Sequence, residues 1–290
     1  MLQRLKTAIP LILIVALAFL LPGTCGAIFF IALSIAMMSC ACHEMYSMLQ
    51  LPHSRAFQLC TTCATGMLLL LTPFAGNFNA TLIHAVEVVF ICAFFLCTVL
   101  IVFKHGPTRP MVDAMLASLG IFIYAGWTLL FIAKLYFLGG CSGRDGRELI
   151  IFLIAVTKMA DVGAYIVGSN SAKLPSGNHK LAPVLSPKKS WEGLLGGTLF
   201  STATAIGLSY IPALVDFNGK PMFNIWEAAV FGLAASVIGL LGDLAESAVK
   251  RAANVKDSGK IPGIGGILDV LDSLIPIAPL FYAYIIIKLF

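Results

Sequence analysis

Apolar segments of membrane-spanning length recur along the whole chain and are separated by short polar connections. A helix of about twenty apolar residues crosses the hydrocarbon core of a bilayer and satisfies its own backbone hydrogen bonds there. The pattern therefore predicts an all-α, polytopic integral membrane protein with about nine transmembrane helices. The expected spans are residues 8–21, 26–43, 57–75, 80–103, 113–137, 148–169, 191–213, 225–249 and 267–289.

Composition and charge support a membrane protein and exclude an ordinary soluble domain. Hydrophobic residues make up 59% of the chain and charged residues 11%, and the mean hydropathy is +0.94. If the N-terminus is cytoplasmic, most lysines and arginines fall on the cytoplasmic side, as the positive-inside rule requires. The polar segments 170–190 and 250–266 then share that face, which predicts one site facing the cytoplasm in the cell inner (plasma) membrane.

The polar chemistry is concentrated in the C-terminal half of the chain. This predicts a scaffold of transmembrane helices over residues 1–147 and a catalytic part over residues 148–290. The net charge of +5 favours an anionic lipid surface or a phosphate-bearing ligand, and no nucleic acid is expected. Most of the cysteines lie in apolar spans, where they pack as small hydrophobes, and whether Cys25 and Cys141 pair is left open.

The eighth span ends in a cluster of acidic and basic residues. Asp243, Ser247 and Lys250 share one helix face that extends about 10 Å along the axis. That face suits a polyphosphate, with a divalent cation between Asp243 and the phosphate oxygens and with Lys250 and Arg251 neutralising the remaining charge. The simpler alternative is an ordinary ion pair between Glu246 and Lys250 at a helix end.

A glycine-rich loop follows this helix. Lys256 and Asp257 precede the sequence SGKIPGIGG, whose glycines either let the backbone approach a phosphate or form tight turns. Asp269 and Asp272 come next, three residues apart at the start of the last span. A carboxylate returned to the vicinity of Asp243 would complete a metal site between two helices.

Two further groups of charged residues lie upstream. Lys158 and Asp161 stand three residues apart in the sixth span, where they either neutralise each other or Asp161 contributes to the polar site. Lys188 and Lys189 in the next connection suit a lipid phosphate, although a basic cytoplasmic loop would look similar.

Three ordered motifs over residues 155–275 resemble those of the phosphatidate cytidylyltransferase family, also called CDP-diacylglycerol synthases. They are DVGAYIVG from Asp161, SPKKSWEG from Ser186, and a C-terminal signature that combines Ser-x-x-Lys-Arg, Lys-Asp, a Pro-Gly-His-Gly-Gly turn and Asp-Arg-x-Asp. The signature matches at Ser247, Lys250, Arg251, Lys256, Asp257, Ser258, Gly259, Pro262, Gly263, Gly265, Gly266, Asp269 and Asp272. The chain departs from it at Ile264, where the family has histidine, and at Val270, where it has arginine.

The resemblance implies transfer of a cytidylyl group from CTP to phosphatidate, which gives CDP-diacylglycerol and pyrophosphate for phospholipid synthesis. It implies Mg²⁺ held by Asp243 and Asp269, with a second cation left open. Phosphate clamping falls to Lys250, Arg251 and Lys256, and Asp257 orients the loop or a second cation. Lys188 and Lys189 are expected to bind the phosphate of phosphatidate. Ser247, Asp161 and Asp272 are also expected to contact substrate.

Other functions remain open from the sequence. A CTP-dependent polyprenol or phytol kinase would share the membrane and the nucleotide, but it does not share the extended signature. A CDP-alcohol phosphotransferase would show an Asp-Gly-x-x-Ala-Arg motif, which this chain lacks. An ion-coupled transporter could use buried acids such as Asp161 and Asp243, although repeated halves are expected of it. The acyl-chain preference and the oligomeric state, including a homodimer, are left open.

Overall fold

Two compact units make up the chain in the computed structural model, which describes residues 2–74, 80–138, 146–175, 177–211, 216–217 and 220–289. Unit 1 comprises residues 1–138 and 253–270, and unit 2 comprises residues 139–252 and 271–290. The segment 253–270 therefore packs with the N-terminal helices. The predicted division into a scaffold (residues 1–147) and a catalytic part (residues 148–290) stays a prediction.

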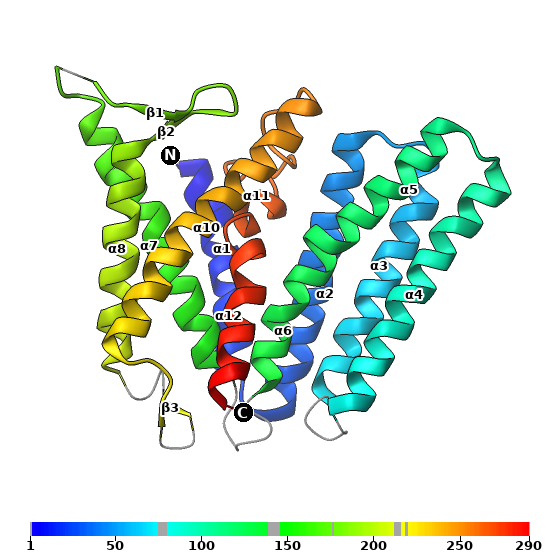
Figure 1. Ribbon diagram of the computed structural model, residues 1–290, viewed down its shortest axis with the longest axis horizontal. Coiled ribbons are helices and arrows are strands. Elements are labelled where there is room, and N and C mark those ends of the chain that lie inside the picture. The colour runs from blue at the N-terminus through cyan, green and yellow to red at the C-terminus, as the bar shows by residue number, and fades with distance from the viewer. Residues whose placement is uncertain are drawn as a thin grey trace. The chain divides into compact units, whose positions relative to one another are not determined.

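Unit 1 is built from helices that neighbour each other in chain order (Figure 1). Stacked rings also join helices that are not consecutive in the chain, with centroids 4.0 Å apart for Phe30 and Tyr136 and 4.4 Å apart for Phe94 and Phe122. The elements are α1 (Leu2–Leu20), α2 (Gly23–Leu49), α3 (Ser54–Leu71), the short 3-10 helix η1 (Thr72–Phe74), α4 (Ala80–His105), α5 (Arg109–Ile121), the π-helical turn η2 (Phe122–Trp127) and α6 (Thr128–Leu138). The unit also contains most of α11 (Ile267–Leu271).

An ion pair lies among the apolar helices of unit 1. Lys134 Nζ lies 2.6 Å from Glu87 Oε1, and both side chains are largely buried. The ammonium group also lies 5.1 Å from the ring centroid of Phe131. Because a lone charge is costly in a membrane, the pair joins α4 to α6 at a defined register.

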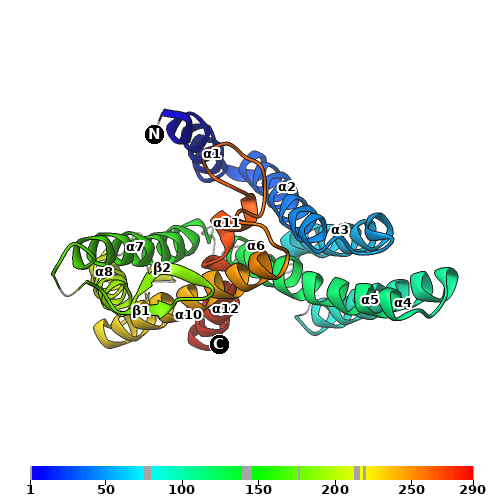
Figure 2. The same cartoon turned by 90° about the horizontal axis from the view of Figure 1, so that it is seen from above.

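Unit 2 places three helices, α7, α8 and α10, side by side, as both views show (Figures 1 and 2). Its core contains Phe152, Phe223, Phe231 and Phe281, with Phe152 and Phe223 stacked at 4.8 Å. The elements are α7 (Arg147–Ser171), β1 (Lys180–Ala182), β2 (Ser186–Ser190), α8 (Trp191–Ser209), β3 (Asp216–Phe217), β4 (Lys220–Pro221), α10 (Ile225–Ala252) and α12 (Leu274–Leu289). The strands form two antiparallel hairpins, β1 with β2 and β3 with β4.

Small residues allow α7, α8 and α10 to approach closely. A Cβ atom at Gly163 would lie 2.7 Å from the carbonyl oxygen of Gly196, and one at Gly232 would lie 2.5 Å from Cα of Thr202. The hydroxyl of Ser201 lies 3.1 Å from the carbonyl oxygen of Val156 and 2.8 Å from that of Gly232. Close packing and polar contacts of this kind hold transmembrane helices together.

Each predicted span is helical over most of the residues that the structure describes, but the count of about nine transmembrane helices is not confirmed. Six helices of the described residues are long and apolar enough to span a membrane: Gly23–Leu49, Ser54–Phe74, His84–His105, Arg109–Leu138, Arg147–Ser171 and Ile225–Ala252. Ile9–Leu20 and Leu274–Lys288 are shorter apolar helices. The last predicted span is divided between α11 and α12, and the two hairpins add short strands to an otherwise helical fold.

The orientation of the N-terminus stays a prediction. The pairing of Cys25 is likewise untested, because Cys141 lies outside the described residues.

The contact between α8 and α10 can be tested with a pair of glycine substitutions. Gly232→Ala is expected to destabilise the protein by about 1–3 kcal/mol, because the new methyl group would meet backbone atoms that cannot move alone. Gly207→Ala is the matched control on α8, where a Cβ atom meets nothing within 4 Å. Thermal unfolding in detergent measures both, and equal melting temperatures for the two variants would contradict the packing described for α8 and α10.

Candidate active site

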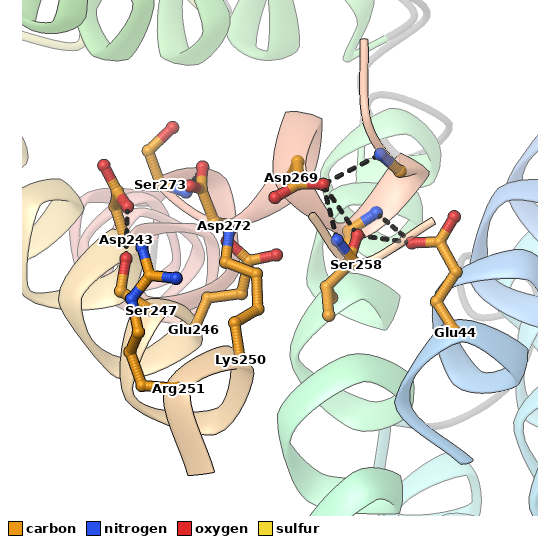
Figure 3. A network of polar contacts seen from close by, with 12 residues as sticks. Glu44, Asp243, Glu246, Ser247, Lys250, Arg251, Ser258, Asp269, Asp272 and Ser273 are labelled. Carbon is orange, nitrogen blue, oxygen red and sulfur yellow. Dashed lines mark hydrogen bonds and ion pairs between the residues drawn. The ribbon is translucent and has the colours of Figure 1, made fainter. Parts of the chain in front are cut away.

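Three carboxylates meet in unit 2 at the end of α10. Asp243 and Glu246 come from α10, Asp272 comes from the turn before α12, and one oxygen of each lies within 4.8 Å of the others (Figure 3). Gly242 explains how α10 comes so close to this turn, since a Cβ atom there would collide with the carbonyl oxygen of Asp272. These three side chains are called the carboxylate cluster below.

Two lysines offset part of the negative charge of the carboxylate cluster. Lys189 Nζ lies 2.6 Å from Asp243 Oδ2, and Lys250 Nζ donates to Glu246 Oε2 over 2.7 Å. The predicted pair of Glu246 and Lys250 therefore exists, but it is buried, since the carboxylate of Glu246 is fully covered. The pair therefore differs from an ordinary surface pair. Both charges have lost their hydration by burial, and this loss opposes the attraction between them.

Asp272 shows the electrostatic cost of the cluster. It lies between α11 and α12, outside the spanning helices, and burial together with the nearby charge of Asp243 raises the pKa of its carboxyl to about 7. A carboxylate held so close to another needs a proton or a cation nearby. Ser247 Oγ donates to Asp243 Oδ1 over 3.3 Å and helps to orient that carboxylate.

Lys158 connects the sixth predicted span to this region. Its Nζ donates to Asp161 Oδ2 over 3.3 Å and to Ser273 Oγ over 3.1 Å. The first of the two alternatives for this pair is therefore present, and a contribution of Asp161 to the polar site stays a prediction. Asp161 is half exposed and is linked through Lys158 to the residue that follows Asp272.

The β1–β2 hairpin brings the second predicted motif to the end of α10. Ser190 ends β2 and caps α8, where its hydroxyl oxygen accepts from the backbone N–H of Gly193 over 3.1 Å. Lys189 thereby reaches Asp243, whereas Lys188 is exposed. Arg251 Nε also donates to the carbonyl oxygen of Leu185, so the basic connection contacts the end of α10 within unit 2. Whether the rest of segment 250–266 joins the same site stays a prediction, because residues 253–266 belong to unit 1.

The glycine-rich loop is part of unit 1 and forms a tight turn. The backbone N–H groups of Ile264 and Gly265 donate to the carbonyl oxygen of Ile261, and Gly263 and Gly265 have φ values of 86° and 95°. Left-handed backbone of this kind favours glycine. At these two positions the glycines therefore serve the turn, and Ile264 lies within it.

Asp269 accepts hydrogen bonds from both ends of the glycine-rich loop. Its Oδ2 accepts from the backbone N–H of Ser258 over 2.9 Å, from the hydroxyl of Ser258 over 2.9 Å and from the backbone N–H of Gly266 over 2.8 Å. Lys256 and Asp257 are exposed beside this anchor. Asp269 belongs to unit 1 and Asp243 to unit 2, so their pairing as metal ligands stays a prediction.

Glu44 on α2 is a polar residue that the sequence analysis missed. Its carboxylate accepts from Ser258 Oγ over 2.8 Å and from the backbone N–H groups of Ile267 and Leu268 over 2.9 Å each (Figure 3). The side chain is buried, with 8% of the residue exposed. An isolated acid in an apolar helix was the available signal, because such residues are rare unless a partner is present.

The chain matches a family model, described as the cytidylyltransferase family, over residues 2–288. A phosphatidate cytidylyltransferase of Brucella suis biovar 1 (strain 1330) is 34% identical over 284 residues, which cover 97% of this chain and 92% of that protein. A phosphatidate cytidylyltransferase of Staphylococcus haemolyticus (strain JCSC1435) is 43% identical over 137 residues, or 47% of this chain. The match spans 48%, about half, of the length of that staphylococcal relative. The agreement along nearly the whole chain shows that this protein belongs to the cytidylyltransferase family.

Proposed function

We propose that this protein transfers a cytidylyl group from CTP to phosphatidate and releases pyrophosphate, as the names of its relatives suggest. The observation that carries the proposal is the carboxylate cluster with Lys189 and Lys250 beside it, at the end of a membrane-length helix. Acids and bases gathered in an apolar chain suit a polyphosphate and a lipid phosphate at the membrane surface. The site would face the cytoplasm in the inner membrane.

The reaction needs positioning and charge neutralisation more than proton transfer. A phosphate oxygen of phosphatidate attacks the α-phosphorus of CTP, a new P–O bond forms, and the bond to the pyrophosphate leaving group breaks with its electron pair. A phosphate monoester is already mostly ionised at neutral pH, since its second pKa is about 6. The protein therefore needs no dedicated general base for the lipid.

The carboxylate cluster fits a hard divalent cation such as Mg²⁺, which binds one or two carboxylates together with substrate phosphates. Asp243 and Asp272 would hold it, and Glu246 is near enough to assist. A bound cation would neutralise charge on the phosphates and on the departing pyrophosphate. The family resemblance proposes Asp269 as a further ligand of the cation. A second cation would likewise need carboxylate ligands such as Asp269.

The cationic side chains would neutralise the substrates. Lys250 and Arg251 at the end of α10 and Lys256 in the loop are proposed to clamp the nucleotide phosphates. Asp257 would orient the loop, and Ser247 would hold Asp243 through its hydroxyl group. The phosphatidate phosphate is assigned to Lys188 and Lys189, with Asp161 steadied by Lys158 at the edge of the site.

The central experiment measures CDP-diacylglycerol formed from labelled CTP and phosphatidate in detergent, with and without magnesium. The wild type should form the product only with a divalent cation, and Asp243→Asn should lower kcat by at least about 100-fold because the cation loses a charged ligand. Melting temperatures of the two proteins should agree. Phosphorylated polyprenol as the product would point to the kinase alternative, and undiminished activity in Asp243→Asn would refute the role of that carboxylate.

The two adjacent lysines of β2 offer a matched comparison. Lys189→Met should lower kcat/KM for phosphatidate about tenfold more than Lys188→Met, because Lys189 lies beside the carboxylate cluster whereas Lys188 is exposed. Initial rates at varied phosphatidate, with CTP saturating, provide the measurement. Equal losses for the two variants would show that the chain uses these residues only as surface charge.

A further inference from the structure

We propose that Glu44 is a positioning residue that fixes the glycine-rich loop and so sets the direction in which Lys256 and Asp257 are presented. This inference rests on the proposed function, since it concerns how the loop would serve the nucleotide. It adds a residue of the N-terminal helices to the contacts of a loop whose motif residues all lie in the C-terminal half of the chain.

The contacts of Glu44 are unusually complete for one side chain. One carboxylate oxygen accepts from the backbone N–H of Ile267, and the other accepts from the backbone N–H of Leu268 and faces the hydroxyl of Ser258. These partners are more than two hundred residues away along the chain. The carboxylate thus ties both ends of the glycine-rich loop to α2.

Two glycines leave the room that the carboxylate occupies. A Cβ atom at Gly259 would lie 2.6 Å from Glu44 Oε1, and one at Gly266 would collide with Ser258 Oγ and with Glu44 Oε2. Neither glycine has the left-handed backbone seen at Gly263 and Gly265. Their small size therefore serves the approach of Glu44 rather than the turn, and this is an independent sign that the loop is built around the acid.

Ser258, where Glu44 and Asp269 hold the loop, lies next to the exposed residues Lys256 and Asp257. Ser258 is buried and directly follows Lys256 and Asp257 in the chain, both of which are exposed. Its hydroxyl lies 2.8 Å from Glu44 and 2.9 Å from Asp269, and its single hydrogen serves one of them at a time. Ser258 is held by hydrogen bonds to both Glu44 and Asp269. The backbone of the two residues before it is therefore fixed, and so is the direction in which their side chains project.

The isosteric variant Glu44→Gln tests this role. A glutamine amide has one oxygen and one NH₂ group, so it cannot accept from both Ile267 and Leu268 as the carboxylate does. The variant should raise KM for CTP about tenfold, as expected for the loss of one charged hydrogen bond. KM for phosphatidate should stay within twofold of the wild type, because Lys188 and Lys189 lie on a different segment.

The controls separate positioning from simple stability. Glu44→Asp keeps the charge and both acceptor oxygens and should recover part of the loss in KM for CTP. His43→Ala changes the neighbouring residue of α2, whose ring nitrogen lies 3.0 Å from Gln58 Nε2, and should leave both KM values unchanged. A merely structural role of Glu44 would lower the melting temperature and the active fraction while both KM values stayed constant, and that pattern would overturn the proposal.

Backbone hydrogen exchange provides a readout that does not depend on activity. Peptides covering residues 255–268 should exchange at least about tenfold faster in Glu44→Gln and, to a smaller degree, in Ser258→Ala, while peptides of α8 keep their wild-type rates. Unchanged exchange in both variants would overturn the proposal that Glu44 holds the glycine-rich loop in place. If the wild type formed no CDP-diacylglycerol, the proposed function would fail, whereas the exchange experiment would still decide whether Glu44 holds the loop.

Discussion

The cost of placing charge in an apolar protein governs where this chain can put its chemistry. At the end of α10, the carboxylates of Asp243, Glu246 and Asp272 lie together, and Lys189 and Lys250 offset part of their mutual repulsion. None of these charges could persist alone in such surroundings. The same requirement explains the buried pair of Glu87 with Lys134, which joins α4 to α6.

Packing of small residues makes this arrangement possible. Gly163 and Gly232 bring α7, α8 and α10 into contact, and Gly242 lets the turn before α12 approach α10 closely enough to deliver Asp272. Ser190 caps α8 and fixes the strand that carries Lys189. Glycine and serine residues of these helices and turns thus allow the charged residues of the cluster to meet.

The hydrophobic pattern predicted the helices well because membrane-length apolar segments have few alternatives to a helix. Helix periodicity placed Asp243, Ser247 and Lys250 on one face, but it did not predict that Asp243 meets Glu246 and Asp272. Asp272 comes from a turn, and helix periodicity does not extend across a turn. Glu44 escaped prediction because its partners are backbone N–H groups of a distant segment, which leave no mark in side-chain spacing. The β1–β2 hairpin was missed because its strands are too short for an alternating pattern to emerge.

A titration of the detergent-solubilised protein with Mn²⁺, followed by electron paramagnetic resonance, tests most directly whether the carboxylate cluster holds a divalent cation. Mn²⁺ prefers the same oxygen ligands as Mg²⁺ and reports binding without substrate turnover. The account predicts that Asp272→Asn weakens the binding of Mn²⁺ at least about tenfold, as Asp243→Asn does. The control Asp113→Asn, which changes an exposed carboxylate of α5 outside the cluster, should bind Mn²⁺ like the wild type. Wild-type binding in Asp272→Asn would contradict the account.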